Sequence, residues 1–285
     1  TIQLQRDRKT AATFAEVKRA LIGWSVARDP ATGGANARPG ELPCPDINPL
    51  DGFEDGNCVA GAIGRVPWKT LGIPEPKDDA GETLWYSVAG PFRIWGVNGN
   101  PINSDTKGNI TVYQDSTATV VTTEAIAVIF APGAARGTQN RDTVATALCP
   151  TTGTTIARNI CATNYLETAA GINNATTNGP FISALASGTF NDKVMVITTS
   201  DLIPPVEQRI GRQLRTILQA YKANTNCFSG CDNLGGTKGC YPWADLSNGY
   251  SDSDPYNAGE GRNRGRIPAL GAGPYDWGSN PCGTA

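Results

Sequence analysis

Eight cysteines and no histidine constrain this 285-residue sequence more than any other feature. No cysteine spacing matches a paired zinc-ribbon pattern, and no histidine can supply a nitrogen ligand. An even number of cysteines then favours disulfides formed in an oxidising compartment. We expect local bridges that join Cys44 to Cys58 and Cys149 to Cys161, because each pair flanks a short loop. The other four can pair in three ways, which the sequence leaves open: Cys227, Cys231, Cys240 and Cys282.

The missing histidine also limits the chemistry of the chain. Ser-His-Asp and Cys-His catalytic arrangements are excluded, and the usual proton shuttle at neutral pH is absent. Carboxylates such as Asp78, Asp79 and Glu82 could serve a glycosidase, but sequence spacing does not give the separation that this mechanism needs. We therefore expect no enzyme. A net charge of -2, with one short basic run at residues 6–9, gives no clear nucleic-acid site.

The first clear element is an amphipathic helix over residues 10–29. Phe14, Val17, Leu21 and Trp24 recur at spacings of three and four, which places them on one helix face. The sequence before residue 10 already looks helical and has no capping signature. We therefore expect the helix to continue from a preceding segment that is missing from this sequence.

Short extended segments follow, at residues 84–88, 110–114, 125–130 and 193–198, where aromatic and branched residues predict strands. Residues 133–180, rich in Thr, Asn, Ala and Gly, are expected to be irregular. The 33 glycines and 20 prolines predict long connections throughout. The fold class that follows is α+β, with the N-terminal helix packed on an antiparallel β-sheet.

A second helix is predicted from Asp201, a suitable N-cap, with Pro204 and Pro205 in its first turn. Its apolar stripe is Ile210, Leu214, Ile217 and Tyr221. We expect residues 1–200 to form one head and residues 201–285 a second helix-led, loop-rich module that contains disulfides.

The two parts echo one another, which suggests a duplicated unit. A Pro-x-x-Asp motif and then a Gly-Arg-aliphatic-Pro motif follow each helix, at residues 43–46 and 64–67 and again at 242–245 and 265–268. We interpret Gly64-Arg65 as a turn whose arginine pairs with Asp46. The alternative is convergent turn chemistry in a chain rich in Pro and Gly.

An acidic loop between the first two cysteines offers hard oxygen ligands interleaved with Gly52 and Gly56, a composition that calcium prefers. Its spacing departs from the EF-hand. A solvated acidic turn closed by a disulfide is the favoured interpretation, and calcium is the alternative. The candidate ligands are Asp46, Asn48, Asp51, Glu54 and Asp55.

Several short motifs in one order carry a family resemblance that covers most of the chain. They are AEVKRALIGW at 15–24, LPCPD at 42–46, GRVPWKTLGIP at 64–74, LWYSV at 84–88, IFAPG at 129–133, YLE at 165–167 and FND at 190–192. With these motifs the chain resembles large bacterial type IV pilin-like proteins, the minor pilins and pseudopilins. The first turn of such a chain would then belong to a longer, very hydrophobic helix, which this sequence lacks.

The resemblance implies a structural role. In that family a prepilin peptidase removes a leader, and the hydrophobic helix anchors the subunit in the inner membrane before it packs in the filament core. The implied partners are other pilin or pseudopilin subunits, with Ile2 and Leu4 as subunit-contact residues, and the implied location is the inner membrane and periplasm, then a cell-surface filament. Some pseudopilins of that family bind calcium in their heads. The alternative function is a secreted adhesin or carbohydrate-binding domain with no filament role.

Overall fold

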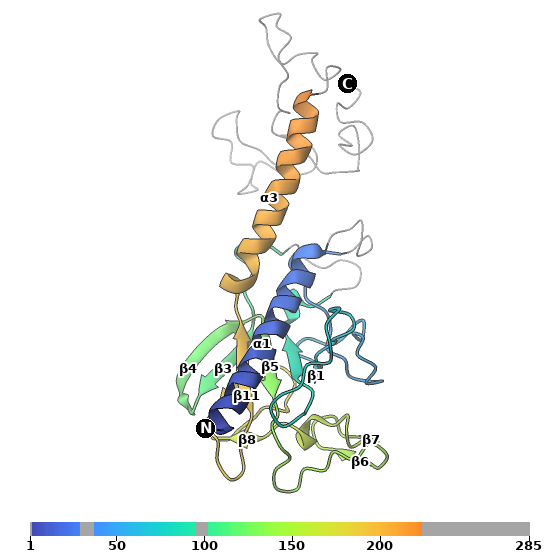
Figure 1. The fold of residues 1–285 in the computed structure, drawn as a ribbon, viewed down its shortest axis with the longest axis vertical. Coiled ribbons are helices and arrows are strands. Elements are labelled where there is room, and N and C mark those ends of the chain that lie inside the picture. Colours follow the sequence, from blue (N-terminus) through green and yellow to red (C-terminus); the bar gives the residue numbers. More distant parts are fainter. Residues whose placement is uncertain (1, 29–36, 95–101, 224–285) are drawn as a thin grey trace, which may run out of the picture. The chain divides into compact units, whose positions relative to one another are not determined.

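Helix α1 (Ile2–Ala27) opens the chain in a computed structural model that describes residues 2–28, 37–94 and 102–223 (Figure 1). Three of the four stripe residues predicted from the sequence are buried: Phe14, Val17 and Leu21. Trp24 is half-buried, and the guanidinium carbon of Arg28 lies 4.6 Å from its ring centroid. One face of α1 is therefore turned into the protein interior, as the periodicity predicts.

Polar contacts also join α1 to the chain around residue 78. The Thr10 hydroxyl donates to Asp79 Oδ1 at 2.9 Å, and the Thr13 hydroxyl donates to the Lys77 carbonyl at 3.1 Å. Thr10 is itself buried, although it is polar. These bonds satisfy polar groups that burial would otherwise leave unpaired.

A four-stranded antiparallel sheet lies at the centre of the molecule, in the order β1-β2-β5-β11. Every residue of the two central strands, β2 and β5, is buried. Short apolar runs without strict alternation are typical of strands covered on both faces. Three of the predicted strands belong to this sheet, namely β2, β5 and β11. The bounds are β1 (Ile63–Arg65), β2 (Trp85–Val88), β5 (Ala127–Ala131) and β11 (Lys193–Ile197).

A second sheet contains β3 (Ile110–Gln114), the fourth predicted strand, between β4 (Ser116–Ala125) and β10 (Phe181–Ser183). β10 runs parallel to β3, whereas β4 runs antiparallel with several register shifts. The sheets of the protein are therefore not all antiparallel. β4 was not predicted, because its threonine-rich residues are mostly exposed on both faces and show no apolar alternation.

Aromatic side chains join the two sheets into one core. Phe130 of β5 meets Phe181 of β10 edge to face, with ring centroids 4.8 Å apart. Trp85 of β2 lies 5.1 Å from Tyr165, and Val112 of β3 belongs to the same buried cluster. Such pairs add to the free energy gained by removing large rings from water.

The expectation that residues 133–180 are irregular is wrong in part. Two short hairpins form there, β6 (Thr146–Cys149) with β7 (Thr154–Ala157), and β8 (Thr168–Ala169) with β9 (Ile172–Asn173). Short 3₁₀ turns occupy Gly90–Phe92 and Ala162–Asn164. Strands of two to four residues carry too little periodicity to be recognised in a sequence.

The second predicted helix is present as α3 (Thr199–Ala223), but it begins earlier than expected. Thr198 precedes its first turn, and Asp201 Oδ2 accepts a hydrogen bond from the Thr198 backbone N–H at 2.9 Å, the geometry of a capping box. Pro204 and Pro205 consequently lie inside the helix rather than in its first turn. Each removes one backbone hydrogen bond there.

The chain divides into two compact units, Thr1–Val206 and Glu207–Ala285. The first contains all the strands described. The second copy of the repeated motifs and the last four cysteines lie outside the described residues, as do the side chains of Ile217 and Tyr221. Among the described helices, none has the length and apolarity needed to cross a membrane.

Leu21→Ala tests the burial of the α1 stripe. Because Leu21 is fully buried, we expect the free energy of unfolding to fall by about 2–5 kcal/mol. Leu4→Ala, the same change at a half-exposed position of the same helix, should alter it by about 0.5 kcal/mol or less. Urea unfolding of both variants measures the difference, and equal effects would contradict the burial of this face.

Candidate functional site

The start of α1 is the first candidate surface, because it is exposed. Residues 4–9 are all exposed, and Leu4 retains 50% of its accessible surface. The side chain of Ile2, the other predicted contact residue, lies outside the described side chains. Asp7 pairs with Lys193 Nζ at 2.8 Å, and this lysine also reaches Asp79 Oδ1 at 3.4 Å. The ion pair places the first turns of α1 beside the start of β11, while Leu4 remains available to another surface.

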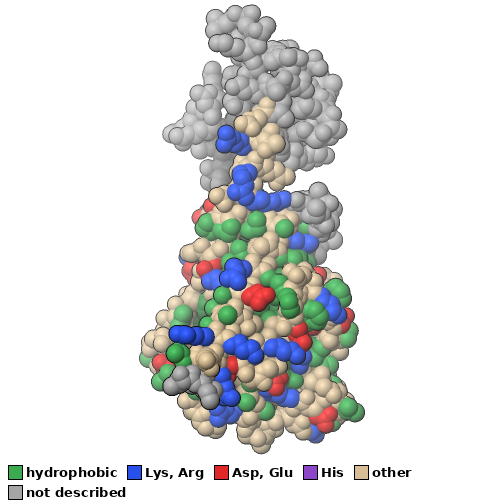
Figure 2. Space-filling view, viewed as in Figure 1, with side chains coloured by type: hydrophobic (Ala, Val, Ile, Leu, Met, Phe, Trp, Pro, Cys, Tyr) green, Lys and Arg blue, Asp and Glu red, His purple; other side chains and the backbone are tan. Residues whose placement is uncertain are grey.

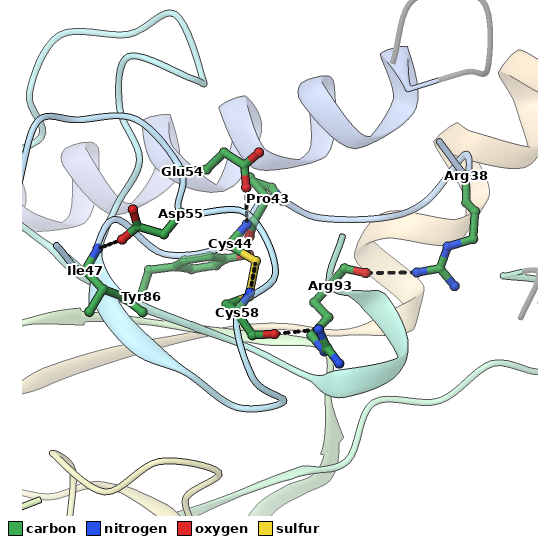
Figure 3. The surroundings of a disulfide bond; sticks show 9 residues. All are labelled: Arg38, Pro43, Cys44, Ile47, Glu54, Asp55, Cys58, Tyr86 and Arg93. Atoms are coloured by element: carbon green, nitrogen blue, oxygen red, sulfur yellow. Dashed lines mark hydrogen bonds between the residues drawn. A yellow bond between two sulfur atoms is a disulfide. The ribbon is translucent and has the colours of Figure 1, made fainter. Parts of the chain in front are cut away.

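The Cys44–Cys58 disulfide closes the acidic loop, with the two Cα atoms 5.8 Å apart (Figure 3). Both cysteines are buried. Tyr86 of β2 donates its hydroxyl proton to the Pro43 carbonyl at 3.2 Å, and Arg93 Nη1 donates to the Cys58 carbonyl. The disulfide thus closes the loop on itself, while hydrogen bonds attach its start to β2 and its end to Arg93, which follows the Gly90–Phe92 turn.

The four carboxylates of the predicted calcium loop accept hydrogen bonds from backbone amides of the loop itself. Each therefore stabilises a turn in a loop that has no regular secondary structure. Within the described residues, no group of three or more acidic, cysteine or histidine side chains is arranged to hold a metal. The bonds run from Gly52 N to Asp46, from Phe53 N to Asp51, from Cys44 N to Glu54, and from Ile47 N and Asn48 N to Asp55.

Asp46 is the most deeply buried of these carboxylates, with 1% of its surface exposed. Burial raises its pKa from the ordinary 3.8 to about 6, although the hydrogen bond from the Gly52 amide opposes the shift and the charges of Asp51 and Asp55 add to it. One carboxylate oxygen, Oδ1, is buried without a hydrogen-bond partner among the described residues. The neutral acid is therefore favoured at this position more than in water.

The first copy of the repeated motifs does not form the predicted ion pair between Arg65 and Asp46. Asp46 and Arg65 pair through their backbones, with N–H to O distances of 2.9 and 2.7 Å between heavy atoms. The Arg65 guanidinium instead donates to the Tyr165 hydroxyl at 3.0 Å. A Cβ on Gly64 would lie 2.6 Å from the Asp46 carbonyl oxygen, so the two segments can approach only because this residue is glycine.

Two adjoining polar cavities lie beside the second disulfide, which joins Cys149 to Cys161. Their volumes are about 460 and 330 Å³, a size that accommodates small ligands. They share Thr138, Gln139 and Thr163, and each has one arginine, Arg158 in the larger and Arg136 in the smaller. These cavities were not predicted, because their walls come from segments that only the fold brings together.

The surface around these features is mixed in charge. On the face shown in Figure 2, basic and acidic side chains are interspersed among hydrophobic ones over the strand-containing part. Such a distribution provides no single-sign stripe on that face for nucleic acid.

Comparison with protein-family models, with curated proteins and with solved structures finds no match to this chain. Its function is therefore inferred from its residues and their contacts.

Asp46→Asn tests the buried acid in the first loop. Since the pKa of Asp46 is higher in the folded than in the unfolded chain, its contribution to stability is full below pH about 4 and is lost as the pH rises through about 6. Asparagine imitates the neutral acid and does not titrate. We expect the variant to lack this loss, so that its stability relative to the wild type increases from pH 4 to pH 7.

The measurement is the free energy of unfolding in urea at each pH. Asp105→Asn, the same change at an exposed position outside this loop, is the control. Parallel pH profiles for the wild type and Asp46→Asn would show that this carboxyl is not perturbed.

Proposed function

We propose that this chain is the exposed head of a bacterial filament subunit, a minor pilin or pseudopilin of the type IV class. The observation that carries the proposal is the division of α1 into an exposed start, with Leu4, and a later part with Phe14, Val17 and Leu21 buried. In such a helix the buried face packs against its own head, and the exposed start can contact a neighbouring subunit.

The inferred packing of α1 on the four-stranded sheet follows from the burial of β5. Side chains of a strand alternate between faces, and Val128 and Phe130 enter the core shared with the second sheet. Ala127 and Ile129 point the other way and are also buried, so a second layer covers that face. In Figure 1, α1 crosses in front of this sheet, and the Asp7–Lys193 ion pair joins it to β11.

The filament role assigns a partner to the exposed start of α1. A hydrophobic helix continuous with Ile2 would hold the subunit in the inner membrane before assembly and would pack with other subunits afterwards. The head would then face the periplasm and later the cell surface. Two disulfides within the head agree with such an oxidising location. The role is assembly, priming or adhesion by contact, without catalysis.

Leu4→Asp in the full-length gene tests this function. A charge at a helix–helix contact is unfavourable when it is removed from water, so we expect the variant to accumulate in cells but to disappear from sheared filaments. Val144→Asp is the matched control, because Val144 is 87% exposed and lies on the β6 side of the head. Immunoblots of the sheared and cellular fractions give the result. A wild-type chain that is never found in filaments would overturn the proposal.

The two polar cavities favour a second candidate function, binding of a carbohydrate by a secreted adhesin. Hydroxyl and amide side chains line both cavities, and Arg158 is placed to meet an acidic group on a sugar. We expect the chain to bind acidic oligosaccharides on a glycan array and Arg158→Ala to lose that binding, whereas Arg19→Ala on α1 should retain it. Absence of any binding by the wild type would exclude this function.

A further inference from the structure

Two buried carboxylates from distant parts of the chain, one of which also lines the smaller cavity, lie against one another. Glu167, in the YLE motif, and Asp192, in the FND motif, are 7% and 3% exposed. The Glu167 backbone N–H donates to Asp192 Oδ2 at 2.9 Å, and the Asp192 backbone N–H donates to Glu167 Oε2 at 3.2 Å. Each carboxylate therefore binds the backbone of the other residue. This reciprocal pair joins the segment before β8 to the segment before β11.

Neutral donors complete most of the remaining bonds. Gln139 Nε2 donates to Glu167 Oε1 at 3.1 Å, and Asn174 Nδ2 donates to Asp192 Oδ2 at 3.0 Å. The Asn191 backbone N–H adds a bond of 2.8 Å to Glu167 Oε2. One oxygen, Asp192 Oδ1, is buried with no hydrogen-bond partner among the described residues. An unpaired carboxylate oxygen in the interior is costly, and a proton placed on it would remove that cost.

No cation compensates the pair within the described part of the chain. Lys193, the next residue, pairs with Asp7 and Asp79. Arg141 pairs with Glu82. Of the other charged groups on the surrounding segments, Asp78 accepts the Gly133 amide, and Arg136 lines the smaller cavity beside Glu167 without an ion pair. Two adjacent negative charges would thus be buried with only neutral donors around them.

Under these conditions the neutral form of Asp192 is favoured more than in water. Burial raises the pKa of Asp192 well above its usual range, and the negative charge of Glu167 and a hydrogen bond to its side chain raise it further. Bonds from the Glu167 amide and from Asn174 oppose the shift without cancelling it. A proton on Asp192 can then be donated to the Glu167 carboxylate, because the two side chains are close enough to share a hydrogen bond.

We propose that Glu167 and Asp192 share one proton and form a pH-sensitive clasp, which loosens when rising pH removes that proton. The carboxyl proton leaves to hydroxide, and two carboxylates remain in a low-dielectric site. Because the pKa of Asp192 is raised on folding, the stabilisation is full in acid and is lost as the pH rises through the folded value.

The clasp also holds β10. Asn174, which donates to Asp192, donates through the same amide nitrogen to the Ile182 carbonyl at 3.0 Å, and its Oδ1 accepts the Ile182 N–H at 2.8 Å. Ile182 belongs to a small apolar cluster with Ile172 and Phe190. Loosening of the clasp should therefore expose this cluster and the β10 backbone first, before the main core opens.

Infrared spectroscopy of the intact chain tests the shared proton directly. At neutral pD we expect the C=O stretch of a protonated carboxylic acid in the wild type, which Asp192→Asn should remove and exposed Asp142→Asn should retain. In Asp192→Asn the amide N–H takes the place of the acid proton. Its stability should therefore lose the decline that the wild type shows as the pH rises above about 4 towards the folded pKa of Asp192. Its Ile182 amide should no longer exchange faster once that proton is lost.

Glu167→Gln provides a second variant if Asp192→Asn does not fold. With the neighbouring charge removed, Asp192 should ionise at lower pH, and the acid band should disappear as the pH is raised sooner than in the wild type. A wild-type spectrum without an acid band at neutral pD would overturn the proposal. Equal slopes of the free energy of unfolding against pH in the wild type and Asp192→Asn would also overturn it.

Discussion

The burial of β2 and β5 on both faces is the constraint on which the other parts of this head depend. The backbone bonds of these strands are satisfied by β1, β11 and each other, so their side chains set the remaining requirements. On one face, Trp85 and Phe130 require the second sheet and Tyr165. On the other face, the buried stripe of α1 has the apolar character that such a surface needs, which is why we infer that the two meet.

Outside the sheets, carboxylates hold the long connections together. A chain with 33 glycines and 20 prolines forms few regular hydrogen bonds in its loops, yet its buried backbone amides still need acceptors. Asp46, Asp55, Asp78 and Glu167 each accept hydrogen bonds from backbone amides of these connections. Asp46 and Asp55 lie in the loop that the Cys44–Cys58 disulfide closes. This use accounts for the acidic residues that gather in the loops.

The sequence predicted those parts that depend on local pattern. The apolar runs gave β2, β3, β5 and β11, the three-four spacing gave the face of α1, and the short loops gave the two cysteine pairs. It could not predict β4, whose exposed threonines lack a pattern, or the earlier start of α3, where a capping box outweighed the two prolines. The Glu167–Asp192 pair was equally inaccessible, because tertiary packing brings together residues that lie 25 positions apart.

Gln139 connects that pair to the cavities beside the second disulfide. Its amide nitrogen donates to Glu167, its oxygen accepts from the Arg136 backbone N–H and from Arg141 Nη2, and its side chain lines both cavities. The protonation of the clasp and the position of the shared cavity wall therefore depend on the same amide. An amide N–H that donates to a carboxylate favours the ionised form. By linkage, a ligand that favours the present position of Gln139 would therefore oppose the shared proton, and the proton would weaken that ligand by the same factor. A cavity wall can therefore respond to pH without the movement of a domain. It needs only a side chain such as Gln139, which is hydrogen-bonded to a titrating carboxyl pair and also lines the cavity.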